Sequence, residues 1–592
     1  MYKARDWHSL APLFVPRISF GTAGLRAAMR PGYAQMNDVV VLQTSQGLAA
    51  YIERHVDDAK QRGVVIGHDH RAAANGLRSD MFAKLVRNVF ANRGWNVYMF
   101  DQLVHTPMVP FAVAKLNAAA GVMITASHNP AQDNGYKACR HLKTQVYWGN
   151  AVQIVPPHDA GIAQAILQSL EIDESLWNTS NNATQWQGTQ AMIDAYFEMV
   201  SLMAQNKLAN SQSDLKVTYT AMHGVGLPFA QRAFETFGFR PEQFLVVEEQ
   251  AKPDPTFSTV KFPNPEEKGA LDFALAHADK HGSTLVVAND PDADRFNCAE
   301  KTEAKGWQIF TGDQIGAMLG ARALQKYKSA GKDTKRLAMC ASTVSSKMLQ
   351  AMAQQEGFVF RETLTGFKFL GNEALKLVEQ GYETIFEYEE AIGYAHGELR
   401  DKDGVTALAN FCEMAGDLKA QGQTVSHYLD SLYAKYGFFA SSNSYFICRD
   451  PKITNRIFNK LRFDSSSDLQ ILSNLKDYEY RLRLPIQLGG YDVTYIRDLT
   501  VGYDSSNGPT FEPDLPVDKH AHMISFAVGD RDQGDGVQVT GTIRTSGTEP
   551  KIKFYLEGSG HNRQAVFDKL AHIRQALGNE WLRWQENQLE KP

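Results

Sequence analysis

One local pattern recurs along the chain and limits the folds that it can adopt. A short apolar run rich in β-branched residues is followed by a small polar loop and then by a helical pattern. The pattern occurs at 63–71, 120–130, 283–295, 336–346 and 383–394. Such runs predict α/β units with largely buried strands, whose ligands collect at the loops that follow the strands. Any one of these loops could be an ordinary turn that carries a helix N-cap. The repetition of such loops after five apolar runs favours a functional role for them.

The length of the chain and the changes in residue pattern along it predict several domains. Its 592 residues allow about three to five domains of roughly 100–200 residues each. The polar segments 206–216 and 325–336 are predicted to be linkers. Beyond about residue 450, alternating runs such as MISFAVGD and IKFYLEG predict strands with one solvated face. The terminal domain is therefore expected to be of mixed α+β type.

The composition argues against several classes of protein. The net charge is -5 and no dense Lys/Arg block is present, so no nucleic-acid surface is expected. None of the five cysteines forms a CxxC pair, which argues against a zinc site or a disulfide framework and for a reducing compartment. No window approaches about 18 consecutive apolar residues, and the N-terminal apolar patch is too short for a signal-peptide core. We expect a soluble, cytoplasmic protein without membrane partners.

The loop NDPDADRF contains the strongest candidate for a metal site. Asp290, Asp292 and Asp294 alternate directly after an apolar run, and carboxylates at this spacing can converge on one hard cation. An EF-hand would need glycine and glutamate where the sequence has Arg295 and Lys301. Mg²⁺ fits better, because it keeps positions open for water and a substrate phosphate. The alternative is a solvated acidic turn, which the repulsion among three aspartates disfavours.

Two further segments offer groups that bind phosphate. In IRTSGTEPK, Arg544 supplies a planar fork for phosphate oxygens, and Ser546 and Thr548 add hydroxyl donors. Gly547 allows backbone N–H groups to approach an anion. A simple glycine turn is the alternative, and the absence of GxxxxGK[ST] excludes a P-loop kinase. The segment FGTAGLRAAM carries Arg26, which could equally be a solvent-facing arginine in a β-turn.

The segment FEYEEAIGY ends another apolar run with two adjacent carboxylates. Glu389 and Glu390 can accept hydrogen bonds from sugar hydroxyls. Lys402 follows in the sequence DKDG and could reach a phosphate. The alternative for adjacent glutamates is a solvated helix start, where their charge would favour the helix dipole.

The stretch TASHNPAQDNGYK places Ser127 at the end of an apolar run. This serine does not lie in a GxSxG elbow, so a hydrolase is not indicated. His128 is predicted to point away from Ser127 in an extended chain, which makes it a doubtful base for its neighbour. An exposed serine near a Mg²⁺ site and a phosphate cradle fits phosphoryl transfer, in which the serine carries a phosphate that bridges to the metal.

These motifs together resemble those of the α-D-phosphohexomutase superfamily. TASHNP, DPDADR, the paired glutamates and RTSGTEP occur in the same order as in that superfamily, and the resemblance covers residues 17–592. The segments GTAGLRAAM, QTSQGL and EEAIGY look more like the branch of phosphopentomutase and phosphoglucomutase-2 type enzymes, which includes glucose-1,6-bisphosphate synthases.

The resemblance implies four domains around a central cleft. Three similar α/β domains with mixed sheets would be followed by a smaller α+β domain. The expected boundaries place the phosphoserine loop in domain I (1–212) and the Mg²⁺ loop in domain II (213–328). The sugar-binding loop would lie in domain III (329–455), and the phosphate-binding loop in domain IV (456–592).

The resemblance also implies catalytic roles. Ser127 matches the phosphoserine. His128 and Lys137 match residues that flank the transfer, with Lys137 as the candidate general acid/base. Arg295 and Arg26 would help to neutralise the transferring group. The three aspartates would bind one Mg²⁺ with the serine phosphate as a further ligand.

The remaining implied residues bind substrate. Glu389 and its neighbour Glu390 would contact sugar hydroxyls, and the RTSGT loop would hold the phosphate that is not being transferred. The other implied substrate-binding residues are Lys368, Lys402, Arg544, Ser546, Gly547 and Thr548.

The implied reaction is a mutase that moves phosphate between the two ends of one sugar through a bisphosphate. Glucose 1,6-bisphosphate or ribose 1,5-bisphosphate would serve as activator, sugar phosphates would be the partners, and the enzyme would be a monomer or weak dimer. Ordinary phosphoglucomutases carry Ser two places after the first Glu of the sugar loop, where this chain has Ala391. We therefore expect a phosphopentomutase that interconverts (deoxy)ribose 1-phosphate and 5-phosphate and retains phosphoglucomutase activity on glucose 1-phosphate.

There are two alternatives to a phosphopentomutase. One is a glucose-1,6-bisphosphate synthase that uses 1,3-bisphosphoglycerate, which the loop residues do not separate from a mutase. The other is a non-catalytic scaffold, which would be expected to have lost Ser127 or the aspartates; all of them are present.

Overall fold

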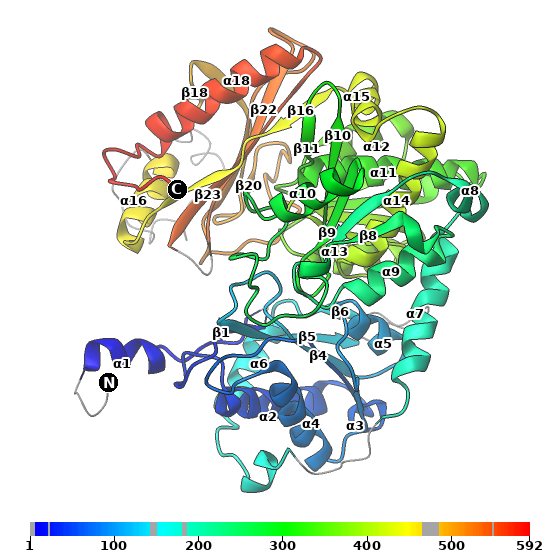
Figure 1. The fold of residues 1–592 in the computed structure, drawn as a ribbon. Helices are drawn as coiled ribbons and strands as arrows, with labels where there is room; N and C mark the ends of the chain where they lie inside the picture. Colours follow the sequence, from blue (N-terminus) through cyan, green and yellow to red (C-terminus); the bar gives the residue numbers. More distant parts are fainter. Residues whose placement is uncertain (1–5, 22–23, 142–150, 180–185, 464–484, 547–549) are drawn as a thin grey trace. The chain divides into compact units, whose positions relative to one another are not determined.

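The chain forms two compact units, each with its own β-sheets (Figure 1). The computed structural model describes residues 6–21, 24–141, 151–179, 186–463, 485–546 and 550–592. The first unit consists of residues 1–342 and 357–428, and the second consists of residues 343–356 and 429–592. Within the described residues, the first unit contains three sheets and the second contains a fourth.

The first sheet is mixed, with strand order β1-β5-β4-β2-β3 and β6 added beside β5. Strand β2 pairs in parallel with β3 and β4, whereas β5 runs antiparallel to β4 and β1. Every residue of β2 and β4 is buried, as expected for strands covered on both faces. The strands are β1 (Leu25–Ala28), β2 (Val64–His68), β3 (Val97–Met99), β4 (Ala120–Ile124), β5 (Asp133–His141) and β6 (Ala151–Gln153).

The second and third sheets repeat this arrangement. Their orders are β11-β10-β9-β7-β8 and β13-β12-β14-β15, and in both the parallel strands end in an antiparallel neighbour, β10 or β15. The strands of the second sheet are β7 (Val217–Thr220), β8 (Phe244–Val246), β9 (Leu285–Asn289), β10 (Phe296–Thr302) and β11 (Gly306–Ile309). Those of the third are β12 (Leu337–Ser342), β13 (Val359–Thr363), β14 (Glu383–Glu389) and β15 (Gly393–His396).

The three sheets share one topology. In each, four strands that are consecutive in the chain lie in the order fourth, third, first, second: β5-β4-β2-β3, β10-β9-β7-β8 and β15-β14-β12-β13. The fourth strand is the antiparallel one in every case. The prediction of three similar α/β domains with mixed sheets is therefore confirmed.

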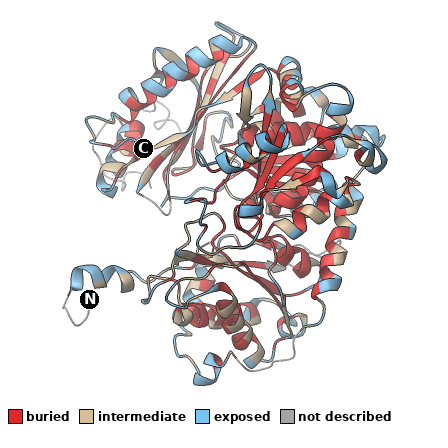
Figure 2. Ribbon diagram, viewed as in Figure 1, coloured by how far each residue is buried: buried red, intermediate tan, exposed pale blue. Residues whose placement is uncertain are grey.

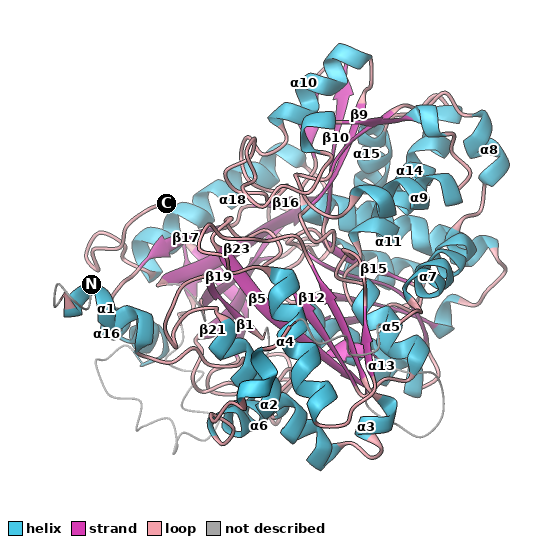
Figure 3. Cartoon of the chain, turned by 60° about the horizontal axis from the view of Figure 1, so that its bottom comes forward, coloured by secondary structure: helices cyan, strands magenta, loops and turns pink. Residues whose placement is uncertain are grey.

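Helices cover these sheets (Figures 2 and 3), and one of them is buried along most of its length. Helix α14 is apolar and buried nearly all round, and Asp403 caps its N-terminus by accepting from the N–H groups of Val405 and Thr406. The helices of this unit are α1 (Trp7–Phe14), α2 (Asp38–His55), α3 (Ala59–Arg62), α4 (Ser79–Asn92), α5 (Met108–Leu116), α6 (His158–Leu167), α7 (Thr189–Met203), α8 (Lys207–Gln212), α9 (Leu227–Thr236), α10 (Asp272–His281), α11 (Gly312–Ser329), α13 (Phe367–Glu379) and α14 (Gly404–Ala420).

The second unit is built on an antiparallel sheet with the order β16-β23-β22-β21-β19-β18. Helices pack on this sheet, so the predicted α+β character of the C-terminal domain is confirmed. Its strands are β16 (Phe438–Ser441), β17 (Ser444–Ile447), β18 (Gln487–Leu488), β19 (Tyr491–Asp498), β20 (Tyr503–Asp504), β21 (Met523–Gly529), β22 (Val537–Thr545) and β23 (Lys551–Gly560). Its helices are α12 (Met348–Glu356), α16 (Pro451–Phe463) and α18 (Arg563–Ala576), and α15 (Val425–Tyr436) begins in the first unit.

Three local predictions differ from the structure. The segment 206–216 is not a plain linker, because it contains α8, where the buried Asn210 amide donates to the Phe237 carbonyl at 2.8 Å. The segment 325–336 begins inside α11. Strand β21 has five consecutive buried residues, so it lacks the predicted solvated face, whereas β23 does alternate over its first half.

The four domain ranges remain a prediction. Strands β16 and β17 lie before residue 456 and pair with β23, so a boundary before 438 would keep the fourth sheet in one domain. Among the described residues, no helix combines the length and the apolar character needed to cross a bilayer.

Candidate active site

Three loops of the first unit carry the predicted chemistry, and they occupy the same place in the three sheets. Each connects the third strand of the shared topology to the antiparallel fourth strand. The serine loop (125–132) joins β4 to β5, the aspartate loop (290–295) joins β9 to β10, and the sugar loop (390–392) joins β14 to β15. These are the carboxyl ends of buried strands, where ligands of α/β sheets bind.

The serine loop holds Ser127 in a turned conformation. Its φ is 52°, in the left-handed region, and its side chain is buried beside the aspartate loop, with 2% of the residue exposed. The Ser127 hydroxyl donates to Asp290 Oδ2 at 2.7 Å, and the Ser127 N–H donates to Thr125 Oγ1 at 2.9 Å. The turn therefore directs the hydroxyl at the aspartates.

The same turn brings His128 back to its neighbour. His128 Nδ1 lies 3.2 Å from Ser127 Oγ, so the prediction that this ring points away from Ser127 is wrong. An extended chain would have separated the two side chains, but the left-handed φ of Ser127 does not leave the chain extended. Burial, together with the nearby charges of Arg295 and Arg26, lowers the pKa of His128 well below its usual value. The ring is therefore neutral at pH 7.

Arg71 binds the backbone of the serine loop. Its side chain is fully buried, and its Nε lies 3.3 Å from Asp69 Oδ2. Its guanidinium N–H groups donate to four carbonyl oxygens, those of Ser127 at 2.6 Å, Asn129 at 2.6 Å, Pro130 at 2.8 Å and Asp133 at 3.0 Å. Sequence reasoning recognised the run 63–71 as a strand and loop but gave Arg71 no role.

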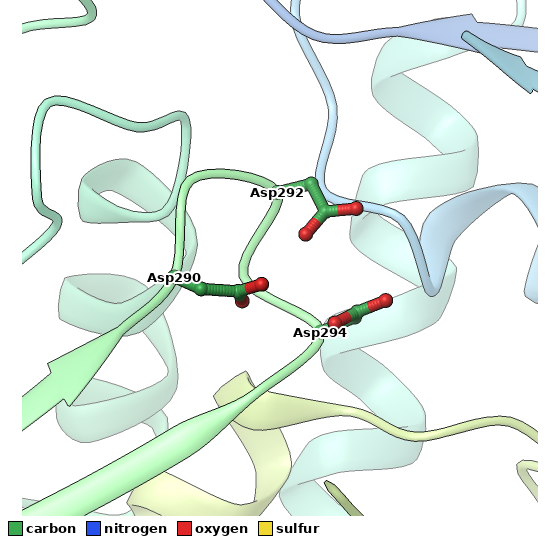
Figure 4. Close-up of side chains that lie close together, drawn as sticks. All are labelled: Asp290, Asp292 and Asp294. Carbon is green, nitrogen blue, oxygen red and sulfur yellow. The ribbon is translucent and has the colours of Figure 1, made fainter. Parts of the chain in front are cut away.

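The aspartate loop gathers its three carboxylates in a buried space (Figure 4). One oxygen from each of Asp290, Asp292 and Asp294 lies within 4.8 Å of the others, and all three residues are 0% exposed. Oδ1 of Asp292 and Oδ1 of Asp294 are buried without a hydrogen-bond partner. Buried, unpartnered carboxylate oxygens fit a hard cation such as Mg²⁺, which takes oxygen ligands.

Basic side chains balance the charge of this loop. Lys137, on β5, donates to Asp292 Oδ2 at 2.8 Å and to Asp294 Oδ2 at 3.0 Å, and Lys402 Nζ lies 3.1 Å from Asp294 Oδ2. The backbone N–H of Arg295 donates to Asp290 Oδ1 at 3.0 Å, and its side-chain Nε lies 3.9 Å from Asp290 Oδ2. The negative charge of the three aspartates is therefore balanced to a greater extent than the sequence suggested.

The pKa values within this cluster follow from burial and from these pairs. Burial, reinforced by the charges of Asp292 and Asp294, raises the pKa of Asp290 well above its usual value. Burial would also raise the pKa of Asp292, but the ion pair with Lys137 lowers it. For Lys137, burial alone would lower the pKa, and the two aspartates that it contacts raise it instead.

The sugar loop presents Glu389 at the end of β14. The residue is buried, and its Oε2 has no hydrogen-bond partner. Burial raises its pKa to about 7, although Lys402 opposes the shift. Its neighbour Glu390 accepts a hydrogen bond from the Ser342 hydroxyl at 3.1 Å. A buried carboxylate with an open oxygen can accept a hydrogen bond from a ligand hydroxyl.

Two other predicted basic residues lie at the edges of these loops. Arg26, on β1, is exposed and donates from Nη1 to Asn129 Oδ1 of the serine loop at 2.9 Å. Lys368 lies in the first turn of α13 with its Nζ 4.8 Å from the centre of the Phe369 ring. Burial lowers the pKa of Lys368, against the opposing effects of Asp159 and Glu389.

The predicted phosphate loop lies in the second unit, between β22 and β23. Arg544 donates to Tyr555 Oη at 3.0 Å, and its Nε is buried without a hydrogen-bond partner. The Ser546 N–H donates to the Lys551 carbonyl at 3.0 Å. Gly547 and Thr548 lie outside the described residues.

Three family models match the chain. Domains I, II and III of the phosphoglucomutase/phosphomannomutase alpha/beta/alpha models cover residues 17–172, 194–305 and 311–436. Among solved structures, the phosphoglucomutase pp63/parafusin of Paramecium superposes with a TM-score of 0.62 at 18% identity, covering 96% of this chain and 95% of that one. This likeness shows the fold.

Curated relatives are similar over nearly the whole chain. The probable phosphoribomutase of Schizosaccharomyces pombe is 42% identical over 100% of this chain and 95% of its own length. Human phosphopentomutase is 42% identical over 93% of this chain and 86% of its own length. Human glucose 1,6-bisphosphate synthase is also 42% identical, over 91% of this chain and 83% of its own length. Overall identity therefore does not separate mutase from synthase.

Proposed function

The chain belongs to the phosphoglucomutase/phosphomannomutase family, and we propose that it is a phosphopentomutase that interconverts (deoxy)ribose 1-phosphate and 5-phosphate. Membership of the predicted superfamily, and with it an isomerase of the phosphotransferase type, is confirmed. The single observation that carries the proposal is the hydrogen bond of 2.7 Å from Ser127 Oγ to Asp290 Oδ2, because it joins the nucleophile loop to the aspartate loop.

The proposed transfer takes place at Ser127 Oγ. In one half-reaction the bond between phosphorus and Ser127 Oγ breaks, and a bond to the free sugar hydroxyl forms. The hydroxyl loses its proton, and Ser127 Oγ regains one. Asp290 Oδ2 at 2.7 Å and His128 Nδ1 at 3.2 Å are placed to hold the proton at this oxygen. The second half-reaction reverses these steps at the other end of the sugar.

The basic side chains around the aspartate loop supply positive charge rather than a group that accepts a proton. The raised pKa values of Lys137 and Lys402, which burial opposes and the adjoining carboxylates produce, keep both ammonium groups protonated at neutral pH. Lys137 can therefore act as a general acid or neutralise phosphoryl oxygens, in line with a transfer that depends on positioning and charge. Arg295 adds a planar fork at the same loop.

We propose that Asp290, Asp292 and Asp294 hold one Mg²⁺. The metal would neutralise phosphoryl charge and orient the transferring group. The unpartnered Oδ1 atoms of Asp292 and Asp294 support this assignment. Glucose 1,6-bisphosphate or ribose 1,5-bisphosphate would act as activator by phosphorylating Ser127.

We also propose a site for the second phosphate and the state of the enzyme in the cell. Arg544 and Ser546, with Gly547 and Thr548, would bind the phosphate that is not transferred, and the unpartnered Nε of Arg544 is in keeping with this role. We propose a cytoplasmic monomer or weak dimer that acts on small sugar phosphates. The net charge of -5 gives no support for a nucleic-acid partner.

The deciding experiment compares kcat/KM for ribose 1-phosphate and glucose 1-phosphate, with Mg²⁺ and a catalytic amount of glucose 1,6-bisphosphate. We expect a clear preference for ribose 1-phosphate, with measurable glucose 1-phosphate activity. A preference for glucose 1-phosphate would overturn the pentose assignment. The Ser127→Ala variant controls for contaminating mutase.

Glucose-1,6-bisphosphate synthase is the second candidate, because human glucose 1,6-bisphosphate synthase is as similar as the mutases. In this reaction the acyl phosphate of 1,3-bisphosphoglycerate phosphorylates Ser127, which passes the phosphate to glucose 1-phosphate and leaves 3-phosphoglycerate. The assay measures glucose 1,6-bisphosphate formed from these two substrates. Faster synthesis than mutase turnover would favour the synthase.

A further inference from the structure

Asp292 uses its two carboxylate oxygens in opposite ways. Oδ2 accepts three hydrogen bonds, from Thr106 Oγ1 at 2.7 Å, from Lys137 Nζ at 2.8 Å and from Thr125 Oγ1 at 3.2 Å. Oδ1 is buried and has no hydrogen-bond partner. Because an oxygen with three donors is held in place, the orientation of the whole carboxylate is fixed, and Oδ1 is the atom left open for a cation.

Thr106 contacts Asp292 twice. Its hydroxyl donates to the side chain, and its N–H donates to the Asp292 carbonyl oxygen at 2.9 Å. Thr106 is 3% exposed and lies two residues before α5, whose Val109 N–H donates back to the Thr106 carbonyl at 3.2 Å. A β-branched side chain on such a backbone has little rotamer freedom. Thr106 therefore fixes both the backbone and the carboxylate of Asp292.

Thr125 connects the serine loop to the same oxygen. Its hydroxyl donates to Asp292 Oδ2 at 3.2 Å and accepts the N–H of Ser127 at 2.9 Å. The residue is fully buried and directly follows β4. One hydroxyl thus links the backbone of Ser127 to the carboxylate of Asp292, although the two residues belong to different sheets.

The groups that hold Asp294 Oδ2 differ in charge from the threonine hydroxyls that hold Asp292 Oδ2. Its Oδ2 is held by two ammonium groups, from Lys137 at 3.0 Å and Lys402 at 3.1 Å. A lysine held close to a metal ligand repels the metal, whereas a neutral hydroxyl positions a carboxylate without adding positive charge. Asp292 shares Lys137 with Asp294, but its other two donors are neutral threonine hydroxyls, which orient the carboxylate without adding a second positive charge.

We propose that Thr106, assisted by Thr125, is a positioning residue that holds Asp292 so that Oδ1 faces the cation. This inference rests on the proposed Mg²⁺ site. Partners that orient a metal ligand typically contribute about 10- to 100-fold to metal affinity. Thr106 makes the shorter contact and a second bond through its backbone, so its hydroxyl contributes more than that of Thr125.

The test measures Mn²⁺ binding by the EPR signal of free Mn²⁺, with displacement by Mg²⁺. Thr106→Val keeps the shape and removes the hydroxyl, and Thr106→Ser is the matched control that keeps it. Intact-mass measurement ensures equal phosphate content on Ser127 in every sample. We expect Thr106→Val to weaken Mn²⁺ binding at least about 10-fold, and Thr106→Ser to bind within about 3-fold of the unmodified protein.

The outcomes separate this inference from the metal site itself. If Mn²⁺ binding to the unmodified protein is insensitive to Asp290→Asn, the proposed metal site is wrong. If Asp290→Asn abolishes binding but Thr106→Val binds Mn²⁺ like the unmodified protein, the positioning role is overturned. Where the thermal unfolding of Thr106→Val shows a damaged fold, Thr125→Val replaces it: weaker Mn²⁺ binding supports the proposal, and unchanged binding overturns it.

Discussion

The aspartate loop of the first unit and the proposed phosphate loop of the second are built differently. Asp290, Asp292 and Asp294 are 0% exposed and are bonded by side chains from several strands and loops. Arg544 and Ser546 are half-buried, and the Arg544 guanidinium donates to the Tyr555 hydroxyl. The first arrangement fits the preorganised site that we propose for the transferring phosphate, whereas the second would hold the phosphate that is not transferred.

The largest effect that this comparison predicts is on Ser127, at the aspartate loop. Ser127→Ala removes the oxygen that would carry the phosphate, so kcat should fall at least about 10³-fold, as for other nucleophile deletions. Steady-state assays with ribose 1-phosphate measure the loss, and incubation with glucose 1,6-bisphosphate followed by intact-mass analysis should show no phosphate uptake. Residual activity above about a tenth of the original would remove Ser127 from the reaction.

Next in size is the effect of removing the buried support of the serine loop. Arg71→Met deletes donors to four carbonyl oxygens and leaves Asp69 without its cation. The loss of a buried ion-pair partner costs about 3–5 kcal/mol, which urea unfolding would measure. Arg71→Lys is the comparison, since it keeps the charge but cannot bind the carbonyls as a fork. Equal stability of Arg71→Met and the unmodified protein would contradict the assigned role.

At the phosphate loop we expect a change in KM rather than in kcat. Arg544→Lys keeps the charge and removes the planar fork, so KM for ribose 1-phosphate should rise about 10-fold, as expected for a lost charge-assisted hydrogen bond. The value of kcat should stay within about 3-fold. A fall in kcat with unchanged KM would mean that this loop acts in the transition state, and the contrast between the two loops would be broken.

The sugar loop allows a smaller effect to be measured through pH. Burial raises the pKa of Glu389 to about 7, so the group is protonated below that pH and accepts hydrogen bonds fully only above it. KM should therefore fall as pH rises from about 6 to about 8, and Glu389→Gln should flatten this part of the profile. The sign for stability is opposite: a raised carboxyl pKa stabilises the fold below the unfolded-state value and loses that contribution as pH rises through 7. Equal pH profiles for both proteins would argue against Glu389 as the titrating group.

The smallest expected effect concerns sugar preference. Ala391→Ser restores one hydroxyl partner, and a single hydrogen bond is worth about 0.5–1.5 kcal/mol. The ratio of kcat/KM for glucose 1-phosphate to that for ribose 1-phosphate should rise about 2- to 10-fold. An unchanged ratio would show that Ala391 does not set the preference.

The sequence predicted those parts of the site whose residues are close together in the chain. The aspartates were recognisable because alternation within one loop brings them together whatever the rest of the fold does. The bond between Thr106 and Asp292 joins residues 186 positions apart, and the bonds from Arg71 to the serine loop span 56 or more, so no local pattern indicated them. The position of His128 depended on one backbone angle of Ser127, which the residue types did not reveal.

The fold was predicted at a similar level of detail. Buried apolar runs with loops after them identified five strands of these sheets, β2, β4, β9, β12 and β14, and the mixed arrangement was implied by the family resemblance. The sequence pattern did not distinguish β21, which is buried over five consecutive residues, from a strand with one solvated face, because both kinds of strand are mostly apolar. Burial on the second face comes from packing that the strand's own residues do not encode.

The shared topology of the three sheets has a consequence for the origin of the molecule. Sheets with the same strand order and a functional loop at the same position indicate descent from one ancestral unit copied in tandem. The copies then diverged: the loop of the first carries Ser127, that of the second carries three aspartates, and that of the third follows Glu389. No copy retains the chemistry of another, so a fragment containing a single copy would inherit a scaffold without a reaction.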